Sequence, residues 1–270
     1  MALGFVVIFK ATGVVNFAQG SLVLVGSYLT FTTSVSWGLP FAPAVVLAGA
    51  GAAATGLAVE RLVVRRLVGQ PVVSVVLATV GVAVVLDQLV TVIWGFGPRN
   101  LDDPWGPRSV AVAGVVLSQV DVATLAVVAA VVAGLSGFFR RTRLGLGLRA
   151  AASDLEAAAA QGISPVLVSR AAWALSAGVA AAAGALLASG PGAATPNLGE
   201  QALRAFPAVL LGGFESLGGA VAGGLVVGVV EVLTAGYLPG HELVAPYVVM
   251  LAVLLVRPSG LFRAPEARRL

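Results

Sequence analysis

Two amide side chains interrupt an apolar stretch near the start of the chain, GVVNFAQGSLVLVGSYLTF at residues 13–31. Asn16 and Gln19 would each lose hydrogen bonds to water in hydrocarbon, at a cost of about 1–3 kcal/mol by mutational estimates. The amides can cap a helix end, or they can border a path for a polar solute, as interrupted helices do in membrane transporters. Both interpretations stay open, and Asn16, Phe17, Gln19 and Gly20 are the candidate lining residues.

Two carboxylates also fall inside apolar segments. A charge at this depth is costly and usually faces the protein interior, so Asp87 is either a proton-relay group or a hydrogen-bonded structural group. Glu231 falls near the end of its segment, where we expect a solvated position. The chain has one histidine and no cysteine, so the sequence predicts no histidine-cluster metal site and no disulfide. We also expect no catalytic residue.

The composition is that of a membrane protein. Hydrophobic residues make up 59% of the 270 residues and charged residues only 10%, with a mean hydropathy of +1.00. A soluble domain carries about 25% charged residues. No linker divides the chain, so we expect a single all-α domain over residues 1–270, a polytopic transmembrane helical bundle. The basic residues lie at the ends of apolar segments, which argues against a nucleic-acid partner.

Apolar segments recur along the whole chain, and roughly 20 residues make one crossing. Helix is expected throughout, because open sheet edges are not tolerated in lipid. We predict about eight spans with an incomplete first one. The expected segments are a fragment at 1–15 and spans at 20–36, 41–58, 72–94, 121–139, 166–189, 203–215, 219–236 and 243–256.

The basic residues indicate the orientation. Twelve of the 16 lie on one side of the predicted spans, which the positive-inside rule assigns to the cytoplasm together with the C-terminus. These twelve are Arg61, Arg65, Arg66, Arg140, Arg141, Arg143, Arg149, Arg170, Arg257, Arg263, Arg268 and Arg269. Of the other four, Arg99, Arg108 and Arg204 fall in opposite loops, and Lys10 lies in the first segment.

The longest basic loop, at 140–165, contains a helix-favouring run from Ala150 to Gln161. Ser153 and Glu156 have the spacing of a capping box. Gly162 is expected to end the helix, and Pro165 to begin the next span. The loop is either a solvated connection or a docking element for a partner protein. Its candidate docking residues are Arg149, Asp154, Glu156, Ala158 and Gly162.

A second glycine-rich stretch is expected to form a tight turn between two spans, facing the cytoplasm. Its glycines permit positive φ and close backbone approach; they are Gly212, Gly213, Gly218 and Gly219. The lysine and following Ser/Thr of a phosphate-binding Walker sequence are absent here and elsewhere in the chain. The sequence therefore predicts no Walker-type phosphate-binding loop in this chain.

Several segments together resemble the permeases of ABC importers in the branched-chain amino acid family. The loop at 141–163 resembles the ATPase-coupling loop of that family, and 10–31 and 206–233 resemble its early and late signatures. The ending VLLVRPSGLF at 253–262 is also typical. The resemblance covers essentially the whole chain, with its motifs in the family's order.

The resemblance implies a non-enzymatic permease subunit in a bacterial or archaeal plasma membrane. It would move branched-chain amino acids, or related amides or urea, into the cell. The implied partners are a second, homologous permease subunit, two ATPase subunits that bind ATP and Mg, and an extracytoplasmic solute-binding protein. The alternative is an ion-coupled secondary amino-acid carrier, for which Asp87 is the only good ion-binding candidate.

The chain departs from the family at two positions. The family usually has a full span before the signature, so we expect about twenty residues of that span to be lacking before Met1. The family also commonly has an acidic residue after the signature glycine, where this chain has Ser21.

The charge distribution predicts a labelling pattern for single cysteines in this cysteine-free chain. Cysteines at Arg65, Gly147 and Arg263 should be shielded from an impermeant external thiol reagent, because the positive-inside rule places them in the cytoplasm. A cysteine at Asp102 should be labelled. External labelling at position 147 would contradict the predicted orientation.

Overall fold

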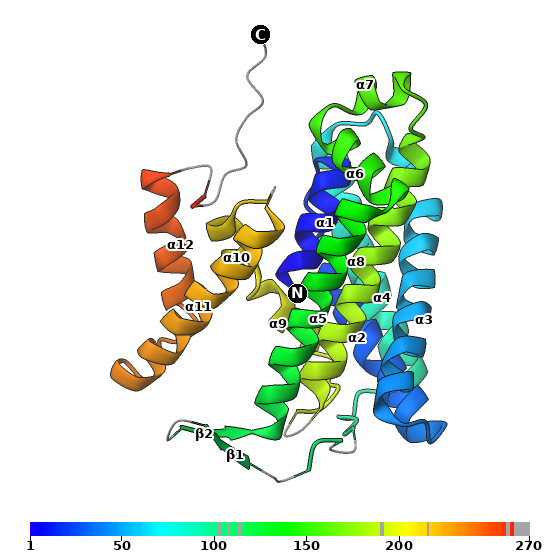
Figure 1. Cartoon of the computed structure of the whole chain (residues 1–270). Coiled ribbons are helices and arrows are strands. Elements are labelled where there is room, and N and C mark those ends of the chain that lie inside the picture. Colours follow the sequence, from blue (N-terminus) through cyan, green and yellow to red (C-terminus); the bar gives the residue numbers. More distant parts are fainter. Residues whose placement is uncertain are drawn as a thin grey trace.

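The computed structural model describes residues 1–101, 104–106, 109–112, 115–189, 192–214, 216–257 and 260–261. Within these residues it is a bundle of helices with short helices at one end and a small β-hairpin at the other (Figure 1). Five helices there are long and apolar enough to cross a membrane: α3 (Phe41–Leu62) continued by η2 (Val64–Leu67), α4 (Val72–Trp94), α5 (Gln119–Arg141), α8 (Pro165–Ala188) and α11 (Leu217–Tyr237). The mainly helical membrane fold is confirmed, whereas the count of about eight spans is not.

The first crossing is interrupted. Helix α1 (Ala2–Thr12) is about 16 Å long at 1.5 Å per residue, too short for a hydrocarbon core of about 30 Å. It ends at Gly13, whose φ of 68° is left-handed and whose N–H donates to the carbonyl of Phe9. After a non-helical segment the chain continues as α2 (Gln19–Phe31) and the π-helical turn η1 (Thr32–Ser36).

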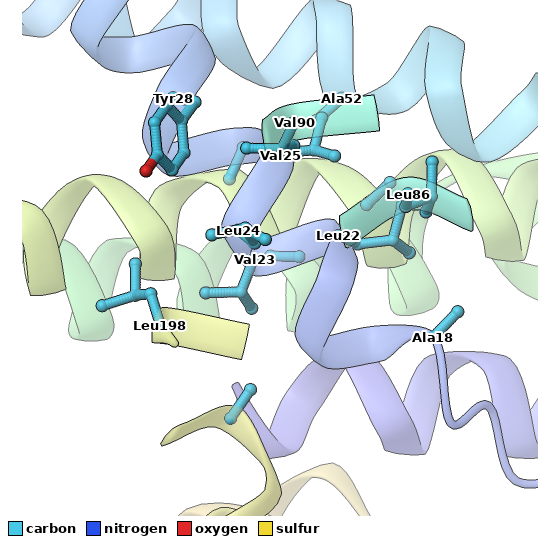
Figure 2. Packing of buried hydrophobic residues seen from close by; sticks show 14 of the residues in the cluster. Ala18, Leu22, Val23, Leu24, Val25, Tyr28, Ala52, Leu86, Val90 and Leu198 are labelled. Atoms are coloured by element: carbon cyan, nitrogen blue, oxygen red, sulfur yellow. The ribbon is translucent and has the colours of Figure 1, made fainter. Parts of the chain in front are cut away.

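Helix α2 is the centre of the larger hydrophobic core. It packs against α3, α4, α8 and the short helix α9 (Leu198–Leu203). Figure 2 shows Leu22 and Leu24 of α2 among side chains from these neighbours, including Leu86 from α4 and Leu198 from α9. All but two residues of α2 are buried. The helix therefore has no lipid-facing side, and its apolar residues surround it instead of forming the single stripe of a surface helix.

Small residues bring α2, α3 and α8 into backbone contact. A Cβ added to Gly26 of α2 would overlap the Cα of Ala181 in α8. One added to Gly184 of α8 would overlap the carbonyl of Val23, and one on Gly56 of α3 would lie 2.6 Å from the carbonyl of Trp173. Such contacts hold membrane helices together through van der Waals packing, because lipid supplies no hydrophobic driving force.

The span predicted at 203–215 is instead one short helix that is preceded by a second short helix. The first, α9, is followed by a turn at Arg204, and α10 (Phe206–Gly212) has Pro207 in its first turn. Pro207 lacks the N–H that would donate to the carbonyl of Leu203 in a continuous helix, so the helical hydrogen bonds are interrupted between α9 and α10. This crossing is therefore interrupted like the first.

The remaining elements complete the two ends. Strands β1 (Ser109–Val112) and β2 (Val115–Ser118) form an antiparallel hairpin that the all-α expectation did not include. At the other end lie α6 (Arg143–Ser153) and α7 (Leu155–Ala160), and α12 (Ala245–Val256) packs on α10 and α11.

A buried carboxylate joins two basic loops at the end of the bundle that carries α7. Glu60, whose side chain is 1% exposed, lies 2.6 Å from Arg65 and 3.9 Å from Arg170 near the start of α8. The two loops therefore share one end, as the alternation of spans predicted. Arg263 and Asp102 lie outside the described residues, and the side that this end faces stays a prediction.

One proposed labelling position needs correction. Gly147 is buried, and a Cβ there would lie 3.5 Å from Ile163. A cysteine at 147 would therefore be shielded from reagent on either side of the membrane. The exposed Arg149, on the same helix, is the informative position.

The close crossing of α2 and α8 predicts that alanine substitutions at two glycines of α8 have different effects on stability. Gly184→Ala would press a methyl group into the α2 backbone and should lower stability by about 1–3 kcal/mol, the usual cost of overpacking. Gly178→Ala is the matched control, since its Cβ would meet only the carbonyl of Gly49, at 4.0 Å. Thermal unfolding in detergent measures both; equal melting temperatures would contradict the packing described.

Candidate functional site

The two amides of the first crossing lie at the mid-depth of the bundle. Ser176 is in the middle of α8, and its hydroxyl donates to Gln19 Oε1 at 2.7 Å, with the carbonyl of Gly4 as an alternative acceptor at 3.0 Å. Helix α2 therefore begins halfway along α8, and the early part of α1 lies at the same level. Figure 1 shows the N-terminus partway along the bundle.

Asn16 holds the turn that leads into α2. Its Oδ1 accepts a hydrogen bond from the backbone N–H of Ala18 at 3.0 Å, and its Nδ2 lies 3.5 Å from Gln19 Oε1. The backbone N–H of Phe17 donates to Thr79 Oγ1 of α4 at 3.1 Å. These side chains satisfy backbone groups that the missing helical turn leaves free, which is the condition for irregular backbone at membrane depth.

Gly20 allows α9, which belongs to the second interrupted segment, to contact the start of α2. A Cβ on Gly20 would overlap the carbonyl of Gly199 in α9. The ring of Phe17 lies 6.2 Å from that of Phe206 at the start of α10. The breaks in the two interrupted crossings therefore meet at the same depth.

The structure thus brings the four sequence-predicted lining residues together, with Asn16 1% and Gln19 0% exposed. Asn16 borders a cavity of only about 10 Å³. Their part in a solute path stays a prediction. Sequence reasoning did not identify Ser176 and Thr79, because each is distant in sequence from the residue that it supports and no local pattern marks it.

The predicted docking loop folds as two helices rather than one. Helix α6 ends at Ser153, and Asp154 is extended, with φ −159° and ψ 108°. The Asp154 carboxylate accepts a hydrogen bond from Ala157 N at 2.9 Å and so caps α7. The expected single helix from Ala150 to Gln161, with Ser153 as its cap, is therefore wrong. Asp154 competes successfully for the cap because its carboxylate reaches the free N–H groups of the next turn.

Gly162 terminates α7, as the sequence predicted. Gly162 has φ +84°, its N–H donates to the carbonyl of Ala159, and Ile163 N–H donates to Ala158. These two bonds are those of a Schellman motif. Ser164 then caps α8, and Pro165 is its first residue.

Helices α6 and α7 have one face on the bundle and one face outside it. Ala158, 5% exposed, belongs to a core cluster with Leu148 and Val168, and α6 contacts α1, α5 and α8. Arg149, Asp154 and Glu156 are exposed. The loop is thus anchored to three helices and presents charged groups outward.

The glycine-rich turn joins α10 and α11 by close backbone contact. A Cβ on Gly212 would overlap Gly219, and the reverse also holds. Gly213 has φ +83°, a conformation that favours glycine. Gly218 makes no close approach. These glycines therefore serve two different purposes, close backbone contact and a positive φ.

The last described residues dock on this turn. The N–H of Leu261 donates to the carbonyl of Leu211 at 2.8 Å, and Gly260 lies against Gly213. Gly260 and Leu261 of the ending are therefore in direct contact with the residues around Gly213.

The fold and these sites define a class of protein. Interrupted crossings that meet at mid-depth, in a bundle of apolar helices, are characteristic of multi-pass membrane transport proteins. Residues 1–256 match the model of the family described as the permease component of the branched-chain amino acid transport system. The chain belongs to this family.

Curated relatives agree with the family match. The chain is 28% identical to the high-affinity branched-chain amino acid transport permease LivH of Salmonella typhimurium, over all of this chain and 92% of the relative. It is 30% identical, with the same coverage, to BraD of Pseudomonas aeruginosa. A probable LivH of Methanocaldococcus jannaschii is 29% identical over 97% of this chain and 87% of its own. No solved structure matches.

The mid-depth hydrogen bonds predict that removal of the Ser176 hydroxyl lowers stability. Ser176→Ala leaves the buried Gln19 amide without its partner on α8 and should lower stability by about 1–3 kcal/mol. Ser27→Ala is the control, because Ser27 is equally buried but donates only to Leu24 of its own helix. Thermal unfolding of both variants measures the difference. An equal loss of stability in the two variants would contradict a special contribution of the hydrogen bond between Ser176 and Gln19.

Proposed function

We propose that this chain is a membrane-spanning subunit of an ATP-driven importer for branched-chain amino acids. It pairs with a second permease subunit, two ATPase subunits and an extracytoplasmic solute-binding protein, in a bacterial or archaeal plasma membrane. ATP and Mg are bound by the ATPase subunits. The family match and the names of the relatives support this proposal, and they give no support to the ion-coupled carrier based on Asp87.

The α6–α7 loop is the observation that carries the mechanical part of the proposal. Its inner face is fixed to α1, α5 and α8, while its outer face is exposed. A force applied to α7 by an ATPase would pass through Ala158 and Leu148 into these helices. Since interior packing is dense and barely compressible, the helices would move with the loop. Closure of the ATPases would in this way alternate access to the path.

The exposed charges on α7 are suited to orient a partner. Asp154 caps α7 and Glu156 lies in its first turn, where acidic groups favour the helix dipole by about 0.3–1 kcal/mol. Arg149 is exposed on the adjoining α6. Together they give the outward face of the loop both signs of charge. The three charged candidate docking residues thus form one surface in this proposal, whereas Ala158 faces the bundle.

Two substitutions in α7 test the proposal. Ala158→Pro removes the bond from Ala158 N to Asp154 O and should disrupt the helix, at a cost of about 3 kcal/mol. Glu156→Lys reverses an exposed charge without touching the bundle. Both variants should insert normally, lose co-purification of the ATPase subunits and lose ATP-dependent leucine uptake.

Arg66→Glu is the control for the charge reversal, because Arg66 is exposed at the same end of the bundle but outside the loop. It should retain both ATPase co-purification and uptake. Uptake at the unaltered rate in both α7 variants would mean that the loop is only a connection between spans.

A further inference from the structure

One buried carboxylate lies at the end of the bundle that carries the α6–α7 loop. Glu60, in the last turn of α3, has a side chain that is only 1% exposed. Its Oε2 lies 2.6 Å from Nη2 of Arg65, and its Oε1 lies 3.4 Å from Nε of the same guanidinium. The Oε2 atom also lies 3.9 Å from Nε of Arg170. Two ion pairs therefore share this one carboxylate.

The two arginines connect Glu60 to different parts of the protein. Arg65 belongs to η2, the turn that follows α3 and precedes α4. Arg170 lies in the second turn of α8, the helix that follows α7. The carboxylate of Glu60 therefore joins the α3–α4 connection to the helix at which the α6–α7 loop ends.

The two contacts differ in kind. The Arg65 guanidinium approaches both carboxylate oxygens, and a bidentate pair of this type is strong and directional. The Arg170 contact is longer than a hydrogen bond, so it is an attraction between charges alone. The Arg65 and Arg170 side chains are 29% and 45% exposed, whereas Glu60 is enclosed. Because partly buried pairs are screened less than exposed ones, the attraction across the α3–α8 contact persists in salt.

Helices α3 and α8 are in backbone contact beside this carboxylate. Gly56 lies one turn before Glu60, and Trp173 lies one turn after Arg170. A Cβ on Gly56 would lie 2.6 Å from the carbonyl of Trp173. Dense packing makes α3 move with α8 at this depth. The ion pairs of Glu60 extend this connection beyond the end of α3, as far as η2.

The η2 turn in its other direction borders the first interrupted crossing. Its residue Val64 is 8% exposed. Val64, Asn16 and Thr79 line the same cavity of about 10 Å³. Thr79 also accepts the hydrogen bond from the N–H of Phe17. A shift of η2 would therefore displace groups that hold the non-helical residues of this crossing.

We propose that Glu60 is a positioning residue for transport, which makes η2 follow α8 when the α6–α7 loop moves. This inference rests on the proposed function and extends the path of force from the loop to the break at Asn16. Closure of the ATPase subunits displaces α8. The charge of Arg170 then acts on Glu60, and the pair with Arg65 carries η2 with it. Chains of packed side chains and ion pairs are the structures through which such coupling passes.

The test measures leucine uptake per ATP hydrolysed by the complete importer, reconstituted in vesicles with its solute-binding protein. Arg170→Gln removes the pair with α8, and Arg65→Gln removes the pair with η2. Each leaves Glu60 one arginine, so neither variant creates an unpaired buried charge that could prevent folding. Both variants should retain the ATPase subunits and ATP hydrolysis. Their uptake per ATP should fall about twofold or more, as for other substitutions along coupling networks.

Two further variants show whether the ion pairs are responsible. Arg61→Gln is the matched control, because Arg61 is exposed in the same turn of α3 and takes no part in the ion pairs of Glu60. Its uptake per ATP should equal that of the unaltered complex. Arg170→Lys keeps the charge, and since the Arg170 contact contains no hydrogen bond, this variant should retain more uptake per ATP than Arg170→Gln.

The outcomes separate a role in transport from a role in folding. Unaltered uptake per ATP in Arg65→Gln and Arg170→Gln would overturn the assignment of Glu60, even if their melting temperatures fall, because a merely structural role lowers stability alone. An equal loss of uptake per ATP in Arg61→Gln, or loss of the ATPase subunits from either variant, would also overturn it. If the unaltered complex moves no leucine, the proposed function fails, and the assignment of Glu60 fails with it.

Discussion

The structure depends on one constraint: in hydrocarbon, each backbone N–H and C=O must find its partner within the protein. A helix interrupted at mid-depth is possible only where side chains replace the lost bonds. Here Asn16 Oδ1 accepts a hydrogen bond from the N–H of Ala18, and Thr79 Oγ1 accepts one from the N–H of Phe17. The hydrogen bond between Ser176 and Gln19 joins α2 to α8. Because the second interrupted segment meets the first at Gly20, both breaks lie within one enclosed region.

Tight packing surrounds that region on one side, and an open groove borders it on the other. Helices α2, α3 and α8 meet through glycines at backbone contact, so this part leaves little space for a solute. The groove between α9–α10 and α11 instead carries charges of both signs. The α6–α7 loop is fixed to α1 and α8, whose early and middle residues border the amide site. Movement of the loop would thus be transmitted to the region where the two interrupted crossings meet.

Continuous features of the sequence predicted most of the fold. The long apolar runs gave α3, α4, α5, α8 and α11, and glycine and proline placed the boundary between α7 and α8. Local competition was harder to judge: Asp154 displaced Ser153 as a cap, and the Arg204–Pro207 region broke a predicted span. The groove could not be predicted. Arg204 was assigned to an external loop and Glu231 to solvent, because only tertiary packing brings them together.

Hydrogen–deuterium exchange on the assembled importer tests the central claim most directly. The claim is that residues 16–18, although not helical, are sealed by side chains, whereas the Arg204–Ala205 junction borders an open groove. Exchange depends on opening and on access to water. The account predicts that the backbone amides of Phe17, Ala18 and Gln19 exchange as slowly as those of α2, and that the junction at 204–205 exchanges faster. Rapid exchange at residues 17–19, at the rate of an exposed loop, would contradict it.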